Sequence, residues 1–293
     1  MKKSVISFII ITILLSFYSC TPYEDYYDDF EYTTAYFAYP EIDRSVIIDE
    51  YDFIQVGAVL GGKLENDTEE WVQYEMVDTL VTNEGYQVLP EALYETSNDE
   101  LGGMTNVITI PEGEFLGMMK ITLKPEFFAD SNALSPTYAL AFRITDASTD
   151  SIGNDVTIVT FKYVSNAVGF YEHRGVAISS ADTLEYQTAG IELVTNAPEG
   201  TNSVRSDMVQ LGPLDLEFDM TMDDDYNITL TSGPDSDAVV TETSPGFFDE
   251  ENDHNIYLNY SFDYDGNSYT ATDTLEFVRR VIDGIEQWDT SFF

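Results

Sequence analysis

The sequence predicts an all-β protein with two antiparallel β-sandwich (immunoglobulin-like) domains, and two observations support this prediction. Short apolar or alternating segments recur along the chain, rich in Val, Ile, Thr, Tyr and Phe and bounded by Gly, Pro, Asn and Asp. No segment keeps a helical period over a long stretch. Such a succession indicates sandwiches rather than a parallel sheet with helices. The predicted strands are residues 36–39, 53–60, 71–77, 107–110, 118–123, 138–144, 156–163, 176–178, 214–220, 228–231, 256–262 and 269–278.

The charge of the chain disfavours one large class of partners. The sequence carries 54 acidic and 12 basic residues, a formal charge of −42. Affinity for nucleic-acid phosphates comes from Lys and Arg, so the chain is not expected to bind nucleic acid, and anionic lipid surfaces are disfavoured for the same reason. Disorder does not follow from the charge, because 43% of the residues are hydrophobic and 14% are aromatic, which is enough for a packed core.

The amino terminus has the layout of a secretory signal. Two lysines precede an apolar run over residues 5–15, which is shorter than the roughly 20 residues that span a bilayer. Residues 17–20, Phe-Tyr-Ser-Cys, then resemble a bacterial lipobox in which Phe17 replaces the usual leucine. This resemblance predicts that residues 1–19 are a signal peptide and that Cys20 is acylated and held in the lipid bilayer. An ordinary signal peptide with an incidental cysteine is the alternative.

Residues 20–33 are predicted to tether the folded protein to the membrane. Residues 21–33 hold many acids and tyrosines and no basic residue. An acidic stretch after a lipid-bearing cysteine resembles the surface-export signal of Bacteroidetes lipoproteins, so we expect the protein on the exposed face of the outer membrane. Fully extended, this tether reaches roughly 45 Å. Cys20 is the sole cysteine, so disulfides are absent and stability must come from packed cores.

Two folded domains are predicted after the tether. The strand pattern breaks near residues 165–167, which divides the chain into an N-terminal β-sandwich domain at 34–165 and a C-terminal β-rich domain at 166–293. Within the first domain, Pro-Glu-Gly at 111–113 indicates a turn that closes a strand. Residues 125–129 begin with proline and are predicted to form one helical turn.

The second domain contains a hairpin that the sequence places with its register. Asp265 and Gly266 separate two alternating segments, residues 255–264 and 267–277, and Asp-Gly favours a two-residue hairpin turn. Alternate strand residues point to the same side. The residues expected to share one face are Ile256, Leu258, Tyr260 and Phe262.

Several segments resemble a known family. Five of them resemble the amino-terminal domain of unknown function of many Bacteroidetes surface lipoproteins: residues 56–62, 71–76, 86–94, 107–113 and 138–147. Three later segments are similar to the partner domain that often follows it: residues 257–260, 273–277 and 280–288. The resemblance implies β-sandwich lipoproteins associated with glycan-utilisation systems, for which an outer-membrane transporter is an expected partner. It carries over no catalytic residue, only the lipid-bearing Cys20.

Known catalytic patterns do not fit the chain, so we predict that it is not an enzyme. Residues 57–63 nearly form a phosphate-binding loop, but Leu64 stands where Ser or Thr should hold Mg²⁺, and the segment reads as the interior of a strand. His173 and His254 lack partners at zinc-ligand spacing and are interpreted as polar surface or strand-edge residues. With 54 acids, almost any fold brings some carboxylates together, so their number does not indicate a glycosidase.

No cofactor and no metal site are predicted, and structural calcium is the alternative left open. Residues 223–227 place acid, acid and Asn at alternate positions, like the start of a calcium loop, but lack the glycine that should follow. Residues 263–267 show the same alternation and are better explained by the hairpin turn.

Trp71 and Trp288 are the candidate ligand-binding residues. A flat aromatic ring suits the apolar face of a sugar, although aromatics in strands more often belong to the core. Trp71 follows an acidic loop and begins a predicted strand, which places it near an exposed rim. Trp288 follows an Asp-Gly turn near the carboxyl terminus. Exposed aromatics within polar rims are typical of binding sites.

Three functions agree with these features. The first hypothesis is a non-catalytic outer-membrane lipoprotein that binds extracellular glycan (polysaccharide) for uptake through several weak contacts. Such a binder is expected to expose two or more aromatics in a row on one face. The second is a structural or adhesive envelope protein that binds other proteins by strand addition, and the third is a glycoside hydrolase with a carboxylate pair.

Overall fold

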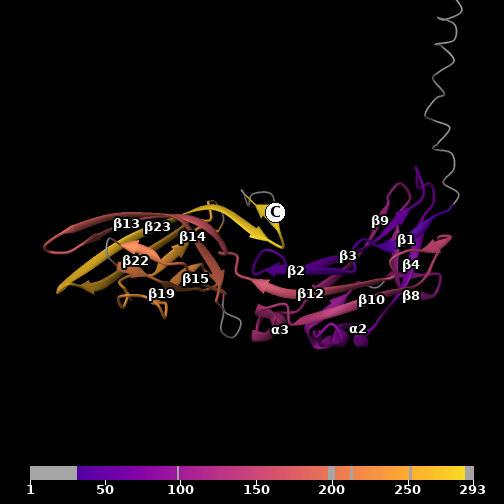
Figure 1. The fold of residues 1–293 in the computed structure, drawn as a ribbon, viewed down its shortest axis with the longest axis horizontal. Coiled ribbons are helices and arrows are strands. Elements are labelled where there is room, and N and C mark those ends of the chain that lie inside the picture. The colour runs from indigo at the N-terminus through magenta and orange to yellow at the C-terminus, as the bar shows by residue number, and fades with distance from the viewer. Residues whose placement is uncertain (1–31, 98, 197–201, 212–213, 251–252, 288–293) are drawn as a thin grey trace, which may run out of the picture.

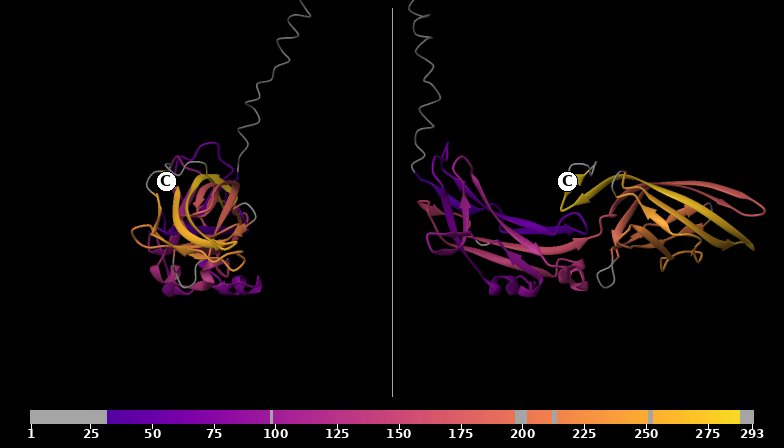
Figure 2. Two further views of the ribbon diagram at one scale, coloured as in Figure 1. Left: turned by 90° about the vertical axis from the view of Figure 1, so that its left-hand side faces the viewer. Right: turned by 180° about the vertical axis from the view of Figure 1, so that it is seen from behind.

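A computed structural model describes residues 32–97, 99–196, 202–211, 214–250 and 253–287 (Figure 1). The prediction of an all-β protein is confirmed, because strands dominate and the helices are short. Strands β1 to β12 build one part and β13 to β24 build the other. The two parts lie end to end, so the molecule is elongated (Figure 2). Within the described ranges, no helix has the length and apolar character that a membrane crossing requires.

The first part is a sandwich of two sheets. One sheet has the strand order β11-β1-β3-β9-β6, and the other has the order β2-β12-β10-β4-β8-β7, with β5 also paired to β10. The strands are β1 (Thr34–Phe37), β2 (Glu41–Ile47), β3 (Phe53–Gly61), β4 (Glu70–Met76), β5 (Gln87–Val88), β6 (Tyr94–Thr96), β7 (Asp99–Leu101), β8 (Met104–Ile110), β9 (Leu116–Leu123), β10 (Tyr138–Ala147), β11 (Ser151–Ile152) and β12 (Val156–Val164). The short helices are α2 (Asp78–Asn83), α3 (Pro125–Phe128), η2 (Glu91–Leu93) and η3 (Ser131–Leu134).

Three pairings in this part are parallel, whereas the sequence predicted antiparallel sheets. Strand β1 pairs with β11, β2 with β12 and β5 with β10 in the parallel sense. Only residues 38–40 separate β1 from β2. Pro40 occupies the last of these positions and cannot donate to a ladder, so pairing in the first sheet stops and the chain continues into the second.

The core of the sandwich follows from strand alternation. In β3 the even-numbered residues from Ile54 to Leu60 are buried, and their neighbours face outwards. The segment that resembled a phosphate-binding loop therefore lies mostly within this strand, as expected. Phe127 fills the core from α3, which confirms the predicted helical turn at 125–129. Helix α2 was not predicted; its Val81 packs against the opposite face of β10 and β12.

The second part is a ring of hydrogen-bonded strands. The order β20-β22-β21-β19-β18-β15-β14-β13-β23-β24 closes on itself because β22 also pairs with β23, and the pairings around the ring are antiparallel. This closed arrangement differs from the open sandwich expected here. The strands are β13 (Gly169–Ile178), β14 (Thr183–Thr195), β15 (Asn202–Ser206), β16 (Val209–Leu211), β17 (Leu214–Leu216), β18 (Phe218–Met222), β19 (Asn227–Ser232), β20 (Thr241–Glu242), β21 (Gly246–Phe248), β22 (Ile256–Tyr264), β23 (Asn267–Ile282) and β24 (Ile285–Gln287).

The predicted hairpin is confirmed with its register. Tyr264 pairs with Asn267 around the two-residue turn, and the pairing continues to Ile256 opposite Leu275. Both turn residues have positive φ, 48° at Asp265 and 77° at Gly266, as an Asp-Gly hairpin turn requires. The residues expected to share one face are all buried inside the ring: Ile256, Leu258, Tyr260 and Phe262.

Two residues at or just beyond the end of β23, Arg280 and Asp283, make polar contacts with the first part. The fully buried guanidinium of Arg280, on β23, forms a two-pronged ion pair with the Glu50 carboxylate in the β2–β3 turn, with Nη2 to Oε2 at 2.7 Å. Asp283, after β23, accepts hydrogen bonds from the backbone N–H of Ser45 at 2.7 Å and from its hydroxyl at 2.6 Å. Paired geometry of this kind is directional, so these contacts fix the second part to the end of β2.

Candidate functional site

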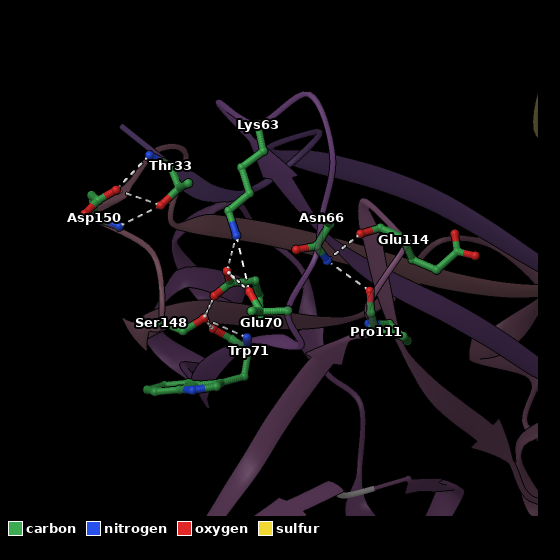
Figure 3. Close-up of polar contacts among 10 residues, drawn as sticks. Thr33, Lys63, Asn66, Glu70, Trp71, Pro111, Glu114, Ser148 and Asp150 are labelled. Atoms are coloured by element: carbon green, nitrogen blue, oxygen red, sulfur yellow. Dashed lines mark hydrogen bonds and ion pairs between the residues drawn. The ribbon is translucent and has the colours of Figure 1, made fainter. Parts of the chain in front are cut away.

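Trp71 lies on the outer face of the first part, at the start of β4. Its neighbours Glu70 and Val72 are buried, so alternation turns the indole outwards, and the ring is half-buried. Figure 3 shows the ring turned away from a group of polar side chains that surround its backbone. The expectation that Trp71 begins a strand near a rim agrees with this position.

The polar group behind Trp71 holds the start of β4 in place. Lys63 forms an ion pair with Glu70, and Ser148 donates to the other Glu70 oxygen at 2.6 Å (Figure 3). The Trp71 N–H donates to the Ser148 hydroxyl at 2.9 Å. Burial raises the pKa of Glu70, but the hydrogen bonds from Lys63 and Ser148 outweigh it, so the pKa lies below its usual value. Glu70 is therefore an ionised anchor for the strand.

The loops beside Trp71 enclose a hollow of about 670 Å³. The side-chain N–H₂ of Asn66 donates to the carbonyls of Pro111 and Glu114, at 3.0 and 2.8 Å, and so ties the two loops together (Figure 3). Trp71 is not among the residues that line this hollow. Trp71 thus offers a single ring on a polar sheet face rather than one wall of a pocket.

The other two residues singled out from the sequence lie outside the described residues. These are Trp288 and Cys20. Their roles as a ligand contact and as the lipid attachment site stay predictions.

A row of five outward side chains crosses the second part. Phe247 on β21 lies opposite Tyr257 on β22, and Tyr257 lies opposite Thr274 on β23. Thr274 in turn lies opposite Arg174 on β13, which faces Gln187 on β14. We call these five residues the cross-strand row. Because neighbouring strands lie about 4.8 Å apart, the row extends over roughly 19 Å.

The aromatic end of the cross-strand row is exposed to solvent. Phe247 is 43% exposed and Tyr257 is 39% exposed, whereas Phe248 and Ile256 beside them are fully buried. Directly opposed strand residues have Cβ atoms about 5 Å apart. Phe247 and Tyr257 are therefore neighbouring residues on one exposed face, and a glycan binder is expected to expose aromatics in a row.

The polar end of the row borders a shallow hollow of about 590 Å³. Gly175 and Tyr186 contribute to its floor, and the outward side chains around it are Arg174, Val176, Glu185, Gln187 and Thr272. Arg174 is held in place by two carboxylates, Glu172 at 3.3 Å and Glu276 at 3.2 Å. Amide, hydroxyl and guanidinium groups thus surround the hollow and can hydrogen-bond a polar ligand.

A buried polar cluster supports this face from inside the ring. Asp273 accepts hydrogen bonds from Tyr186, from Tyr260 at 2.7 Å and from His173 Nε2 at 2.7 Å. Burial, then the nearby Asp273 charge, raises the pKa of both tyrosines well above the usual value, so both stay protonated donors. Gly175 is required here because a Cβ would lie 2.1 Å from Asp273 Oδ1. The backbone under the hollow is therefore fixed.

The interpretation of the histidines as surface or strand-edge residues is wrong. His173 is fully buried against Asp273 and stacks on Tyr186, with ring centroids 5.4 Å apart. His254 is 7% exposed and packs beside Phe248. The local sequence does not indicate this burial, because the carboxylate paired with His173 belongs to Asp273, 100 residues further along the chain.

The remaining candidates for chemistry lie in turns. The Asp223 carboxylate accepts hydrogen bonds from the backbone N–H groups of Asp225 and Asn227, at 3.0 and 2.9 Å, so it stabilises the turn before β19.

In the described part of the chain, no group of three or more His, Cys, Asp or Glu side chains is placed to hold a metal ion. Burial and then the charge of Asp224 raise the pKa of Asp49, which lies in the turn between β2 and β3.

Sequence reasoning did not select Phe247 and Tyr257, although one signal was available. The Asp-Gly hairpin places Tyr257 on the face opposite the buried residues of β22. Phe247 follows Gly246, whose Cβ position would lie 2.6 Å from the Tyr257 carbonyl oxygen. This close approach of β21 to β22 places Phe247 and Tyr257 at opposed positions, and it cannot be read from the alternation of either strand alone.

Comparison with known proteins gives a family match for part of the chain and a shared fold for most of it. A family model described as "-like, N-terminal domain" matches residues 27–151. The crystal structure of a protein of unknown function from Bacteroides ovatus has a TM-score of 0.59 at 18% sequence identity, over 84% of this chain and 94% of its own. At this identity the likeness shows the fold alone. No curated protein matches the chain.

Two further crystal structures from Bacteroides ovatus are more distant. A multidomain protein including DUF1735 has a TM-score of 0.42 at 13% identity, over 86% of this chain and 96% of its own. A candidate carbohydrate-binding protein has a TM-score of 0.31 at 13% identity, over 68% of this chain and 67% of its own. Structures with TM-scores this low do not indicate the function of the present chain.

Proposed function

We propose that this chain is a non-catalytic surface lipoprotein that binds an extracellular glycan along the cross-strand row. The exposed pair formed by Phe247 and Tyr257, in line with Arg174 and Gln187, is the observation that supports this proposal most directly. Aromatic faces stack on the apolar face of a sugar ring, and the polar end supplies hydrogen bonds to its hydroxyl groups. Each contact is weak, so affinity grows with the number of sugar units that reach the row.

Replacing the aromatic pair is expected to abolish most of this affinity. In Phe247→Ala/Tyr257→Ala we expect at least about thirtyfold weaker binding, because each exposed ring contributes about 1 kcal/mol or more at the centre of a contact. Affinity electrophoresis in gels that contain xyloglucan, galactomannan, laminarin or mannan measures the dissociation constant from the retardation of the protein.

A matched control carries the same two substitutions elsewhere. Tyr39 and Phe115 are also exposed but lie in the first part of the chain, so Tyr39→Ala/Phe115→Ala should bind as the wild type does. A Trp71→Ala variant tests the other aromatic surface. If Trp71→Ala loses binding and the aromatic-pair variant keeps it, the site lies on β4 and the cross-strand row is not the binding surface.

The membrane anchor is a separate part of the proposal. Acylation of Cys20 would hold the protein in the outer membrane, with the acidic segment 21–33 placing the folded parts on the cell-surface side and near a transporter. We expect that cells grown with labelled palmitate label the wild-type protein and leave Cys20→Ala unlabelled. Equal labelling of both proteins, or none of either, contradicts lipid attachment at Cys20.

Strand addition to another protein is the second candidate function, and one feature of β14 favours it. Strand β15 pairs only with residues 193–195 of β14. Among the described strands, none pairs with the outer edge of residues 183–187, so backbone groups there can accept a further strand. An adhesin of this type would keep its protein partner in the aromatic-pair variant, whereas a glycan binder would lose its ligand there.

A further inference from the structure

The charges around the cross-strand row carry information about the class of glycan. This step rests on the proposed function, since it concerns the same surface. Four ionisable side chains face the row and its hollow: Arg174, Glu172, Glu276 and Glu185. One positive and three negative charges give 1 − 3 = −2 for this face, within a chain of formal charge −42.

Arg174 does not act as an open anion site. One guanidinium nitrogen, Nη2, contacts both Glu172 and Glu276, so two carboxylates already neutralise the single cation. An incoming carboxylate or sulfate would compete with these two carboxylates for the Arg174 charge and would also meet Glu185 across the hollow. Like charges placed together at an interface cost several kcal/mol.

The same arrangement leaves hydrogen-bond donors available. The two ion pairs of Arg174 use Nη2, and the other guanidinium N–H groups have no further partner among the described residues. Gln187, Asn259, Thr272 and Thr274 lie on the same outer face. Amide and hydroxyl groups can both donate to and accept from sugar hydroxyls without a charge on the sugar.

We infer that the cross-strand row selects a neutral glycan chain, and that Glu172 and Glu276 exclude uronic-acid-containing and sulfated glycans by neutralising Arg174. The chain would lie across the strands, with its apolar sugar faces on Phe247 and Tyr257 and its hydroxyl groups at the polar end. Specificity then comes from a repulsive feature as well as from the attractive contacts.

The test compares neutral and anionic polymers in the same electrophoretic assay. The full folded chain is run in gels that contain xyloglucan, galactomannan, laminarin or mannan, and in gels that contain polygalacturonate or chondroitin sulfate. We expect retardation by at least one neutral polymer, with at least about tenfold weaker binding to both anionic polymers. The Glu172→Gln/Glu276→Gln variant exposes the Arg174 charge and is expected to gain retardation in the anionic gels.

A charge-matched control separates the local effect from the total charge. Glu112→Gln/Glu126→Gln removes two exposed carboxylates from the first part of the chain and should leave the preference for neutral polymers unchanged. Wild-type binding to either anionic polymer that is less than about tenfold weaker than to the neutral polymers, or an unchanged preference in Glu172→Gln/Glu276→Gln, overturns the inference while leaving glycan binding intact. The absence of retardation in all six gels overturns the proposed function instead.

Discussion

Replacing Asp273 by alanine is expected to lower the free energy of unfolding of the second part by about 3–5 kcal/mol. The Asp273 carboxylate is the common acceptor of Tyr186, Tyr260 and His173 inside the ring. Its removal leaves the His173 ring N–H without an acceptor and leaves the two tyrosine hydroxyls only each other as partners, at 3.3 Å, and it also opens a small cavity. Urea unfolding followed by tyrosine fluorescence measures the loss, which corresponds to a fall of more than about 10 °C in melting temperature.

Two further variants serve as an intermediate and a control for Asp273→Ala. Asp273→Asn keeps the shape and one acceptor oxygen, so its loss should lie between those of the wild type and the alanine variant. Asp224→Ala removes an exposed acid from a loop of the same part and should change stability by no more than about 0.5 kcal/mol. If Asp273→Ala loses less than about 1 kcal/mol, the cluster does not hold the backbone beneath the hollow.

The all-β architecture could be predicted because buried apolar residues alternate with exposed residues along most strands. Strands β2 (Glu41–Ile47) and β14 (Thr183–Thr195) were missed for a related reason. The first half of β2 and residues 183–190 of β14 contain no buried residue. Their sequences therefore lack the alternation of apolar and polar residues that indicates a strand. Backbone pairing with β12 and β13 holds these segments in place. Pairing with a strand that is distant in the sequence cannot be predicted from the local sequence.

The candidate site shows the same limit on a smaller scale. The neighbours Tyr257 and Thr274 follow from the Asp-Gly turn, because a two-residue turn fixes the register of both strands. The contact between Thr274 and Arg174 joins strands 100 residues apart. The predicted hairpin therefore contains two of the five residues of the cross-strand row, although sequence reasoning selected neither as a site residue. It selected Trp71 instead, because residue type is visible in a sequence while the neighbours across a sheet are not.

Removing the buried arginine at the junction is expected to uncouple the unfolding of the two parts. Arg280 is fully buried and pairs through two nitrogens with Glu50, which belongs to the other part of the chain. Arg280→Met keeps a long apolar side chain but leaves the carboxylate of Glu50 without its cation, and breaking a buried pair in this way costs about 3–5 kcal/mol. Differential scanning calorimetry should show one coupled transition in the wild type and two transitions in the variant.

The comparison with two other variants decides whether the pair or the arginine itself matters. Arg280→Met/Glu50→Met removes both charges, so it should recover much of the loss, since an apolar pair of similar size often matches a buried ion pair. Arg143→Met breaks the exposed pair with Glu75 and should cost less than about 1 kcal/mol. Equal losses in Arg280→Met and Arg143→Met, with one transition in each, would mean that the Arg280–Glu50 pair does not couple the two parts. Under the proposed function, a rigid junction holds the cross-strand row at a fixed position relative to the first part of the chain. Loss of the Arg280 pair should therefore leave the affinity for a soluble oligosaccharide unchanged while lowering the stability of the whole molecule.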